Sequence, residues 1–151
     1  MPMSQLTEPW VFEENPMVNT QHSQVAVKLT GADTDGAFSL VEYTSLPGTS
    51  VMQHIHTRED KTFIIQAGVF EFWINGETIV AEAGATVNLP MGVRHSFRTL
   101  GTSPGIALIV AAPAGFEYYF NDFSHALQEF GLPLPAAALQ QLNQAYGIIF
   151  E

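Results

Sequence analysis

Three histidines are the residues of this chain best suited to do chemistry: His54, His56 and His95. His54 and His56 are two positions apart, and in a β-strand this spacing puts both imidazoles on one face because side chains alternate. Val51 and Ile55 have the other parity, which predicts a packing face opposite the histidines. Imidazole nitrogen is the commonest side-chain ligand for transition metals, so two on one strand face can chelate a single ion.

The third histidine follows a turn between two further strands. Pro90 and Gly92 supply the turn residues, and His95 begins an apolar alternation with Phe97 on its own parity. Two strands that present a His-x-His pair and a single histidine inward can close a three-nitrogen site inside a barrel. The sequence therefore predicts His54, His56 and His95 as ligands of one divalent transition metal. Fe, Mn, Ni, Zn and Cu all accept imidazole, so the residues do not distinguish among them.

Short strands separated by turns must position these histidines. Asn75-Gly76 is the strongest hairpin signal, and 31–36 is expected to be a loop. The succession predicts an antiparallel sandwich or barrel, with a strand around the His-x-His pair. The other expected strands cover residues 23–30, 37–46, 62–66, 69–74, 77–81, 87–89, 95–100 and 106–112.

The hydrophobic period changes to helical spacing after Pro113. An amphipathic helix is expected to end at Gly131, a second helix is expected over 136–146, and 148–150 is predicted to add an edge strand or a dimer contact. The predicted class is all-β with C-terminal helices. The predicted division is an N-terminal arm (1–22), a β-barrel (23–113) and a C-terminal helical extension (114–151).

Composition narrows the classes of function. The 151 residues carry a formal net charge of −10, which argues against nucleic acid and anionic membranes as partners. No run approaches the roughly 20 apolar residues of a spanning helix, and no signal peptide is visible. The chain has no cysteine, so thiolate ligands and disulfides are excluded. We therefore expect one cytoplasmic domain that binds a small molecule.

Both histidine stretches resemble the two motifs of the cupin family. The resemblance implies an antiparallel jelly-roll β-barrel, carries the three histidines over as metal ligands, and makes a homodimer plausible. The order of the chain and its aromatic C-terminal tail resemble the small single-domain cupins related to quercetin dioxygenases. That group uses a divalent metal, typically held by three His and one Glu, to activate a flavonol-like substrate and O2. The matching residues are Gly48, His54, His56 and Gly68 in the first motif, and Gly84, Pro90, Gly92 and His95 in the second.

Two positions depart from the family pattern: Lys61 replaces the ligand Glu, and Thr99 replaces the terminal Asn. Lys61 shares the parity of Phe63, so it is expected to point inward. At ~5 Å and an effective dielectric of ~20, its ammonium would repel a divalent ion by roughly 6 to 7 kcal/mol. Three outcomes stay open. The three histidines hold the metal while Lys61 leans onto an acid; Asp60 supplies a carboxylate; or the metal is lost and the pocket binds an anion.

Two functions from different classes follow. The first is a metal-dependent dioxygenase acting on a small aromatic or enolic substrate, with Lys61 as general base. The second is a non-catalytic or metal-free cupin in which Lys61 anchors an anionic ligand. Either needs an apolar pocket for a planar molecule. The residues predicted to line it are Phe63, Phe72, Phe97 and Thr99.

Overall fold

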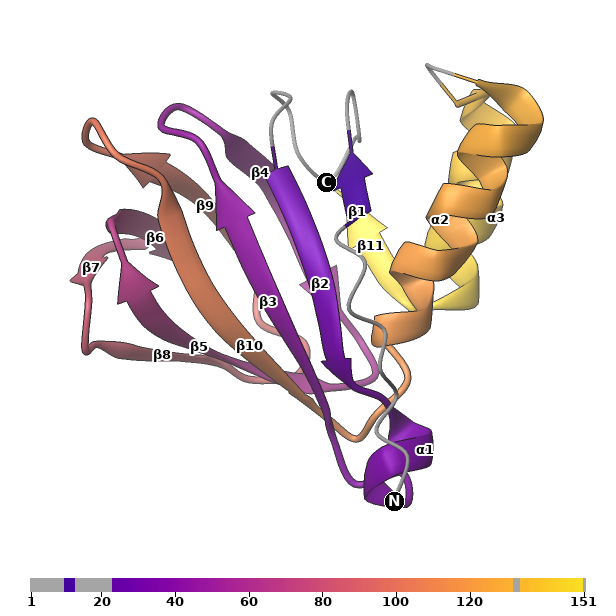
Figure 1. The fold of residues 1–151 in the computed structure, drawn as a ribbon, viewed down its shortest axis with the longest axis horizontal. Helices are drawn as coiled ribbons and strands as arrows, with labels where there is room; N and C mark the ends of the chain where they lie inside the picture. Colours follow the sequence, from indigo (N-terminus) through magenta and orange to yellow (C-terminus); the bar gives the residue numbers. More distant parts are fainter. Residues whose placement is uncertain (1–9, 13–22, 132–133, 151) are drawn as a thin grey trace.

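Two antiparallel sheets face each other and form the body of the molecule (Figure 1). The computed structural model describes residues 10–12, 23–131 and 134–150. The first sheet has the order β1 (Trp10–Phe12), β2 (Ser23–Leu29), β3 (Ser39–Ser45), β10 (Gly105–Ala112), β5 (Asp60–Ala67) and β8 (Thr86–Leu89). The second has the order β11 (Ile148–Phe150), β4 (Ser50–His56), β9 (His95–Leu100), β6 (Val69–Ile74) and β7 (Glu77–Glu82). This jelly-roll arrangement confirms the predicted fold class.

Alternation along the strands explains why the sheets enclose a core. In β3 and β10 every second residue is buried and the residues between are half-buried, as expected for strands that pack one face inward. The hairpin between β6 and β7 turns at Asn75 and Gly76, whose φ angles of 47° and 90° are those of a type I′ turn. The hydrophobic core includes a group of aromatic side chains, among them Phe63, Phe70, Phe72 and Phe97.

A β-bulge in β4 changes one prediction. Val51 pairs with Phe97 and His54 with His95, so three steps along β4 match two along β9. The extra residue reverses the alternation, and Val51 (4% exposed) and His54 (0%) both point into the core. The expectation that Val51 packs on the face opposite the histidines is therefore wrong, because strict period two does not survive a bulge.

The C-terminal part packs beside the sheets as two helices and one strand (Figure 1). Helix α2 spans Glu117–Phe130 and helix α3 spans Ala136–Ala145. Strand β11 pairs with β4, with Ile148 opposite His56 and Phe150 opposite His54. The expected loop at 31–36 instead begins with a short helix, α1 (Gly31–Thr34), because Thr30 and Asp33 form a capping box.

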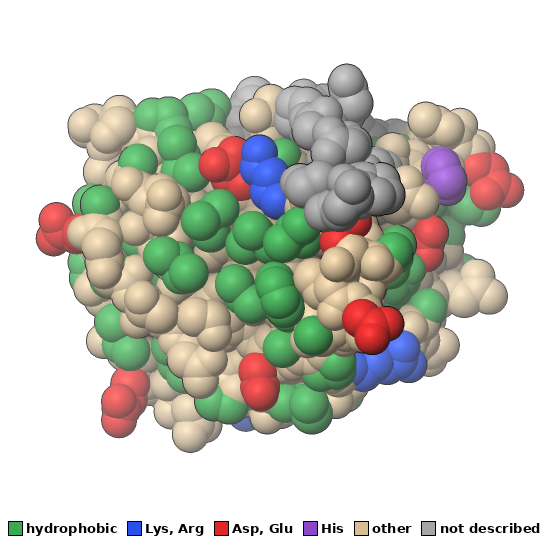
Figure 2. Space-filling view, turned by 60° about the horizontal axis from the view of Figure 1, so that its bottom comes forward, with side chains coloured by type: hydrophobic (Ala, Val, Ile, Leu, Met, Phe, Trp, Pro, Cys, Tyr) green, Lys and Arg blue, Asp and Glu red, His purple; other side chains and the backbone are tan. Residues whose placement is uncertain are grey.

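The outer face of the first sheet is unusually apolar. Leu40, Ile64, Leu108 and Val110 occupy its outward positions and are half-buried. Figure 2 shows hydrophobic side chains gathered on the face it presents, with acidic side chains scattered among and around them. Among the described residues no helix has the length and hydropathy needed to cross a membrane. The predicted domain boundaries stay a prediction, and residues 1–9 and 13–22 of the expected arm lie outside the described residues.

Candidate metal centre

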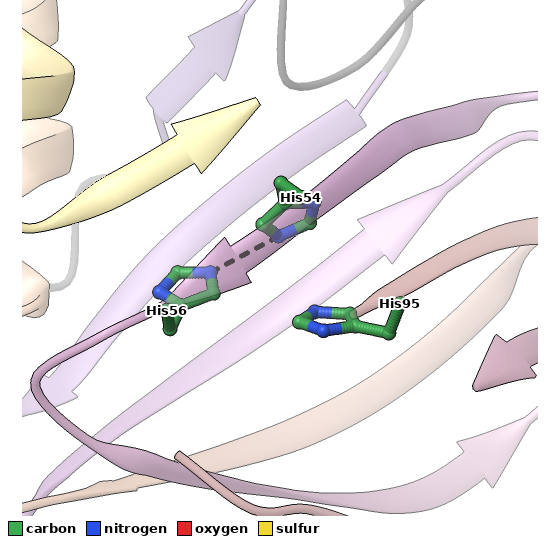
Figure 3. Close-up of side chains that lie close together, drawn as sticks. All are labelled: His54, His56 and His95. Atoms are coloured by element: carbon green, nitrogen blue, oxygen red, sulfur yellow. Dashed lines mark hydrogen bonds between the residues drawn. The ribbon is translucent and has the colours of Figure 1, made fainter. Parts of the chain in front are cut away.

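Paired strands bring the three histidines together in the interior. His54 and His95 are register partners on β4 and β9, and His56 ends β4. All three are buried, at 0%, 3% and 1% exposure for His54, His56 and His95. The Nε2 atoms of His54 and His56 lie 3.0 Å apart, and the His95 ring centroid is 4.3 Å from that of His54 (Figure 3). The structure thus assembles the predicted triad.

The other ring nitrogen of each histidine is tied down. Nδ1 of His54 is 2.7 Å from the carbonyl oxygen of Met52, and Nδ1 of His95 is 3.2 Å from that of Val93. A carbonyl only accepts, so both Nδ1 atoms carry the proton. Nδ1 of His56 donates to the Glu59 carboxylate at 2.6 Å. Each neutral ring therefore has its lone pair on Nε2.

These lone pairs face one another, which is the arrangement a cation requires. Burial lowers the pKa of His54 and His56 well below their usual range, and it lowers the pKa of His95 to about 4, with Lys61 adding to each shift. The rings are therefore neutral at pH 7. The Nε2 atoms of His54 and His56 lie 3.0 Å apart. Because both rings carry their proton on Nδ1, no hydrogen lies between these two nitrogens, and their lone pairs are left for a cation. Nε2 of His95 is buried and has no hydrogen-bond partner among the described residues.

The donor set fits a divalent transition metal. The three ligand nitrogens lie within 4.8 Å of one another. Nitrogens around a tetrahedral ion at about 2.1 Å are about 3.4 Å apart, so closing the site needs ring shifts of about an ångström. Carboxylate and carbonyl partners on Nδ1 are the usual means of orienting metal-binding histidines.

Lys61 points inward, as its parity predicts. It is 3% exposed, and its Nζ lies 3.2 Å from Nε2 of His56. The ammonium also lies 4.8 Å from the ring centroid of Phe116 and 5.5 Å from that of Phe63. Burial lowers the pKa of Lys61 to about 8, although the Glu59 carboxylate opposes this. Near neutral pH the amine is thus close to its own titration point.

Glu59 is the functional candidate that the sequence did not reveal. Its carboxylate binds Nδ1 of His56, and its side chain is 4% exposed. Burial raises its pKa, while the Lys61 ammonium lowers it. Glu59 lies two residues before Lys61, outside the spacing of the family Glu. Its position three residues after His56 was the available signal.

The structure does not bring Asp60 or Thr99 to the triad. Asp60 is exposed and accepts a hydrogen bond of 2.7 Å from the backbone N–H of Met91. Thr99 is buried, but its hydroxyl is hydrogen-bonded to that of Ser45. Asp60 as a ligand therefore has no support from this geometry. Thr99 lies on the interior face of β9, four residues along the strand from His95.

The three predicted pocket phenylalanines form one aromatic cluster. Phe63 lies 5.1 Å from Phe72 and 5.0 Å from Phe97 between ring centroids, and Phe72 lies 5.6 Å from Phe97. Their exposures are 0%, 0% and 7% for Phe63, Phe72 and Phe97. They pack against one another as core residues do. Their role in binding a ligand stays a prediction.

Comparisons with known proteins agree with this fold. Residues 41–111 match the family model described as a cupin domain. The chain is 25% identical over 146 residues to quercetin 2,3-dioxygenase from Bacillus subtilis (strain 168). This match covers 91% of this chain and 43% of that protein. The chain thus spans less than half the length of this curated relative. The resemblance to cupins is confirmed.

Solved structures give the same fold at low sequence identity. A predicted oxalate decarboxylase from Thermotoga maritima superposes with a TM-score of 0.65 and 24% identity, covering 75% of this chain and 99% of its own. KdgF from Halomonas sp. superposes with a TM-score of 0.61 and 16% identity, covering 78% of this chain and 96% of its own. At these identities the likeness shows the fold alone.

Proposed function

We propose that this protein is a metal-binding cupin that acts as a dioxygenase on a small aromatic or enolic, flavonol-like substrate. The observation that carries the proposal is the convergence of three Nε2 lone pairs whose rings are fixed through Nδ1. His54, His56 and His95 would hold the ion. A bound redox-active metal would supply the means to bring substrate and O2 together, as the name of the quercetin 2,3-dioxygenase relative suggests.

The chain's own residues would orient the substrate and move its proton. Lys61 lies beside His56 at the place where the family has a ligand Glu. With its pKa lowered to about 8 by burial, a share of Lys61 is neutral near pH 7 and can accept a proton at Nζ from a substrate hydroxyl. Phe116 and Phe63 flank that amine and exclude water from it. Glu59 keeps the His56 ring in one orientation.

One observation favours a second function. In the structure Nζ of Lys61 can donate to Nε2 of His56, which is the lone pair that a metal would use. A protein that keeps this contact would be a metal-free cupin, with Lys61 anchoring an anionic ligand. The dioxygenase needs Nε2 of His56 as a metal ligand, whereas the anion-binding protein keeps the same nitrogen as the acceptor for Lys61.

Elemental analysis of protein purified without a histidine tag, beside a His54→Ala variant, separates them. Near-stoichiometric Fe, Mn, Ni or Cu that is lost in the variant would support the dioxygenase and justify measuring O2 uptake with flavonols. Zinc alone would support a metal site but contradict a dioxygenase, because Zn²⁺ has no redox chemistry. A protein that neither contains nor takes up metal would favour the anion-binding function.

A homodimer and a cytoplasmic location complete the proposal. The apolar outward positions of the first sheet, with Leu108 among them, support a contact between two copies. Leu108→Lys should give a monomer in analytical ultracentrifugation if that face is the contact. The location rests on the sequence, and a fluorescent fusion would test it.

A further inference from the structure

A surface pocket lies directly behind the triad. It has a volume of about 460 Å³, and its lining includes Arg58, Glu59, Phe116, Tyr118 and Tyr146. Two of these residues also touch the buried site. Glu59 binds His56 through its carboxylate, and the Phe116 ring lies 4.9 Å from the His56 ring in an edge-on contact. The pocket and the histidines are therefore separated by the thickness of one side chain.

Phe116 forms the part of this wall that lies between the pocket and Lys61. Its ring covers Lys61 on one side and lines the pocket on the other. The residue before it, Gly115, has a φ of 140°, a backbone conformation that residues with a Cβ rarely adopt. A rotation of the Phe116 side chain would connect the pocket with Lys61 and His56. Glu59 is held by its hydrogen bond to His56 and is the less mobile neighbour.

The chemistry of the pocket suits a planar anion. Phe116, Tyr118 and Tyr146 offer aromatic rings, and Tyr118 is 42% exposed. Arg58 brings a guanidinium whose Nη1 donates to the carbonyl oxygen of Ala145, and its remaining N–H groups match a carboxylate or an enolate oxygen. The chain has five Lys and Arg against fifteen Asp and Glu, yet Arg58 lines the pocket and Lys61 lies on the other side of Phe116, beside His56. Such a pair would draw an anion inward.

We propose that this pocket is the entrance and first binding site for a planar, anionic small molecule, which reaches the triad past Phe116. Arg58 would hold the anionic group, the tyrosines would hold the ring, and Phe116 would be the gate. This inference rests on the proposed function for what happens at the triad. Binding in the pocket itself needs no metal, so the two can fail separately.

The first experiment measures binding to the metal-free protein. The probes are salicylate, a planar anion, and salicylamide, its neutral counterpart. Arg58→Gln should weaken salicylate about two- to fivefold, as expected for an exposed charge contact, and should leave salicylamide unchanged. Tyr118→Leu should weaken both probes by about three- to tenfold through loss of the ring. The matched control is Arg94→Gln, which removes the same charge from a pocket lined by Ile55, Met91 and Val93.

The second experiment measures passage to the triad. Salicylate mixed with the Co²⁺-loaded protein should change the cobalt absorption spectrum, and Phe116→Leu should make this change several-fold faster at unchanged Co²⁺ affinity. Phe123→Leu, in α2 and also buried, controls for loosened packing. An unaltered rate in Phe116→Leu, or equal weakening by Arg58→Gln and Arg94→Gln, would overturn the proposal. A protein that binds no Co²⁺ would contradict the proposed function. The first experiment would still show whether the pocket binds a planar anion.

Discussion

Nζ of Lys61 lies 3.2 Å from Nε2 of His56, so an ammonium sits beside a lone pair that a bound metal ion would use. The amine is held there by burial between two aromatic rings and by the nearby Glu59 carboxylate. Metal and proton therefore compete for one small volume. This competition makes Lys61 the residue whose replacement tells most about the site.

Replacing Lys61 should strengthen metal binding. Lys61→Met removes the positive charge and keeps the length of the side chain, and we expect a gain in Co²⁺ affinity of about tenfold or more, because a fraction of the repulsion between a +1 and a +2 charge suffices. Lys61→Glu should gain more, since it adds a carboxylate ligand. Titration with Co²⁺ against a competing chelator measures both. Lys28→Met, at an exposed position, is the control. Equal Co²⁺ affinities in wild type and Lys61→Met would mean that the amine of Lys61 turns away from the metal at no cost in free energy.

Lys61→Ala should abolish turnover while sparing the metal. The proposed reaction needs a base beside the substrate hydroxyl, and alanine cannot accept its proton. O2 uptake with a flavonol, measured together with metal content, checks this. If Lys61→Ala turned over at the wild-type rate, Lys61 would have no part in the mechanism.

The stability of the metal-free protein should rise with pH between about 8 and 10.5. Burial lowers the pKa of Lys61 from 10.5 to about 8, so in this window the unfolded chain binds more protons than the folded one. The free energy of unfolding then increases with pH by about 3 kcal/mol at most. Lys61→Met should lack this rise. Urea unfolding of both proteins over the window gives the difference, in which effects of the buried tyrosines cancel. Parallel curves would show that folding does not lower the pKa of Lys61.

Glu59 should set metal affinity without touching the metal. Glu59→Ala removes the acceptor from Nδ1 of His56, and loss of such a partner typically costs 10- to 100-fold in affinity. Glu59→Gln keeps a carbonyl acceptor and should recover part of that loss. Asp60→Asn is the matched control, because Asp60 is adjacent, exposed and able to keep its bond to Met91 as an amide. A loss in Asp60→Asn as large as in Glu59→Ala would remove the special role of Glu59.

The fold and the histidine triad could be predicted from the sequence, but the residues around the triad could not. Hairpin and turn residues mark the strands, and the inward position of Lys61 followed from strict alternation along β5. Alternation failed in β4, since nothing in residues 51–54 announces a bulge. Glu59 was missed because a loop of Thr57, Arg58 and Glu59 has no fixed parity. The pocket behind Phe116 depends on how α2 lies against the barrel, and local pattern does not encode that contact.

The pairing of β11 with β4 affects how the protein is made. Ile148 and Phe150 lie opposite His56 and His54, and the carbonyl of Gly147 accepts from the backbone N–H of Thr57 at 2.9 Å. During synthesis the histidine strands leave the ribosome long before this segment does. Until it arrives, β4 has an open edge beside His54 and His56. A nascent chain therefore completes the walls of its site last, and an ion taken up earlier would meet a site still open on one side.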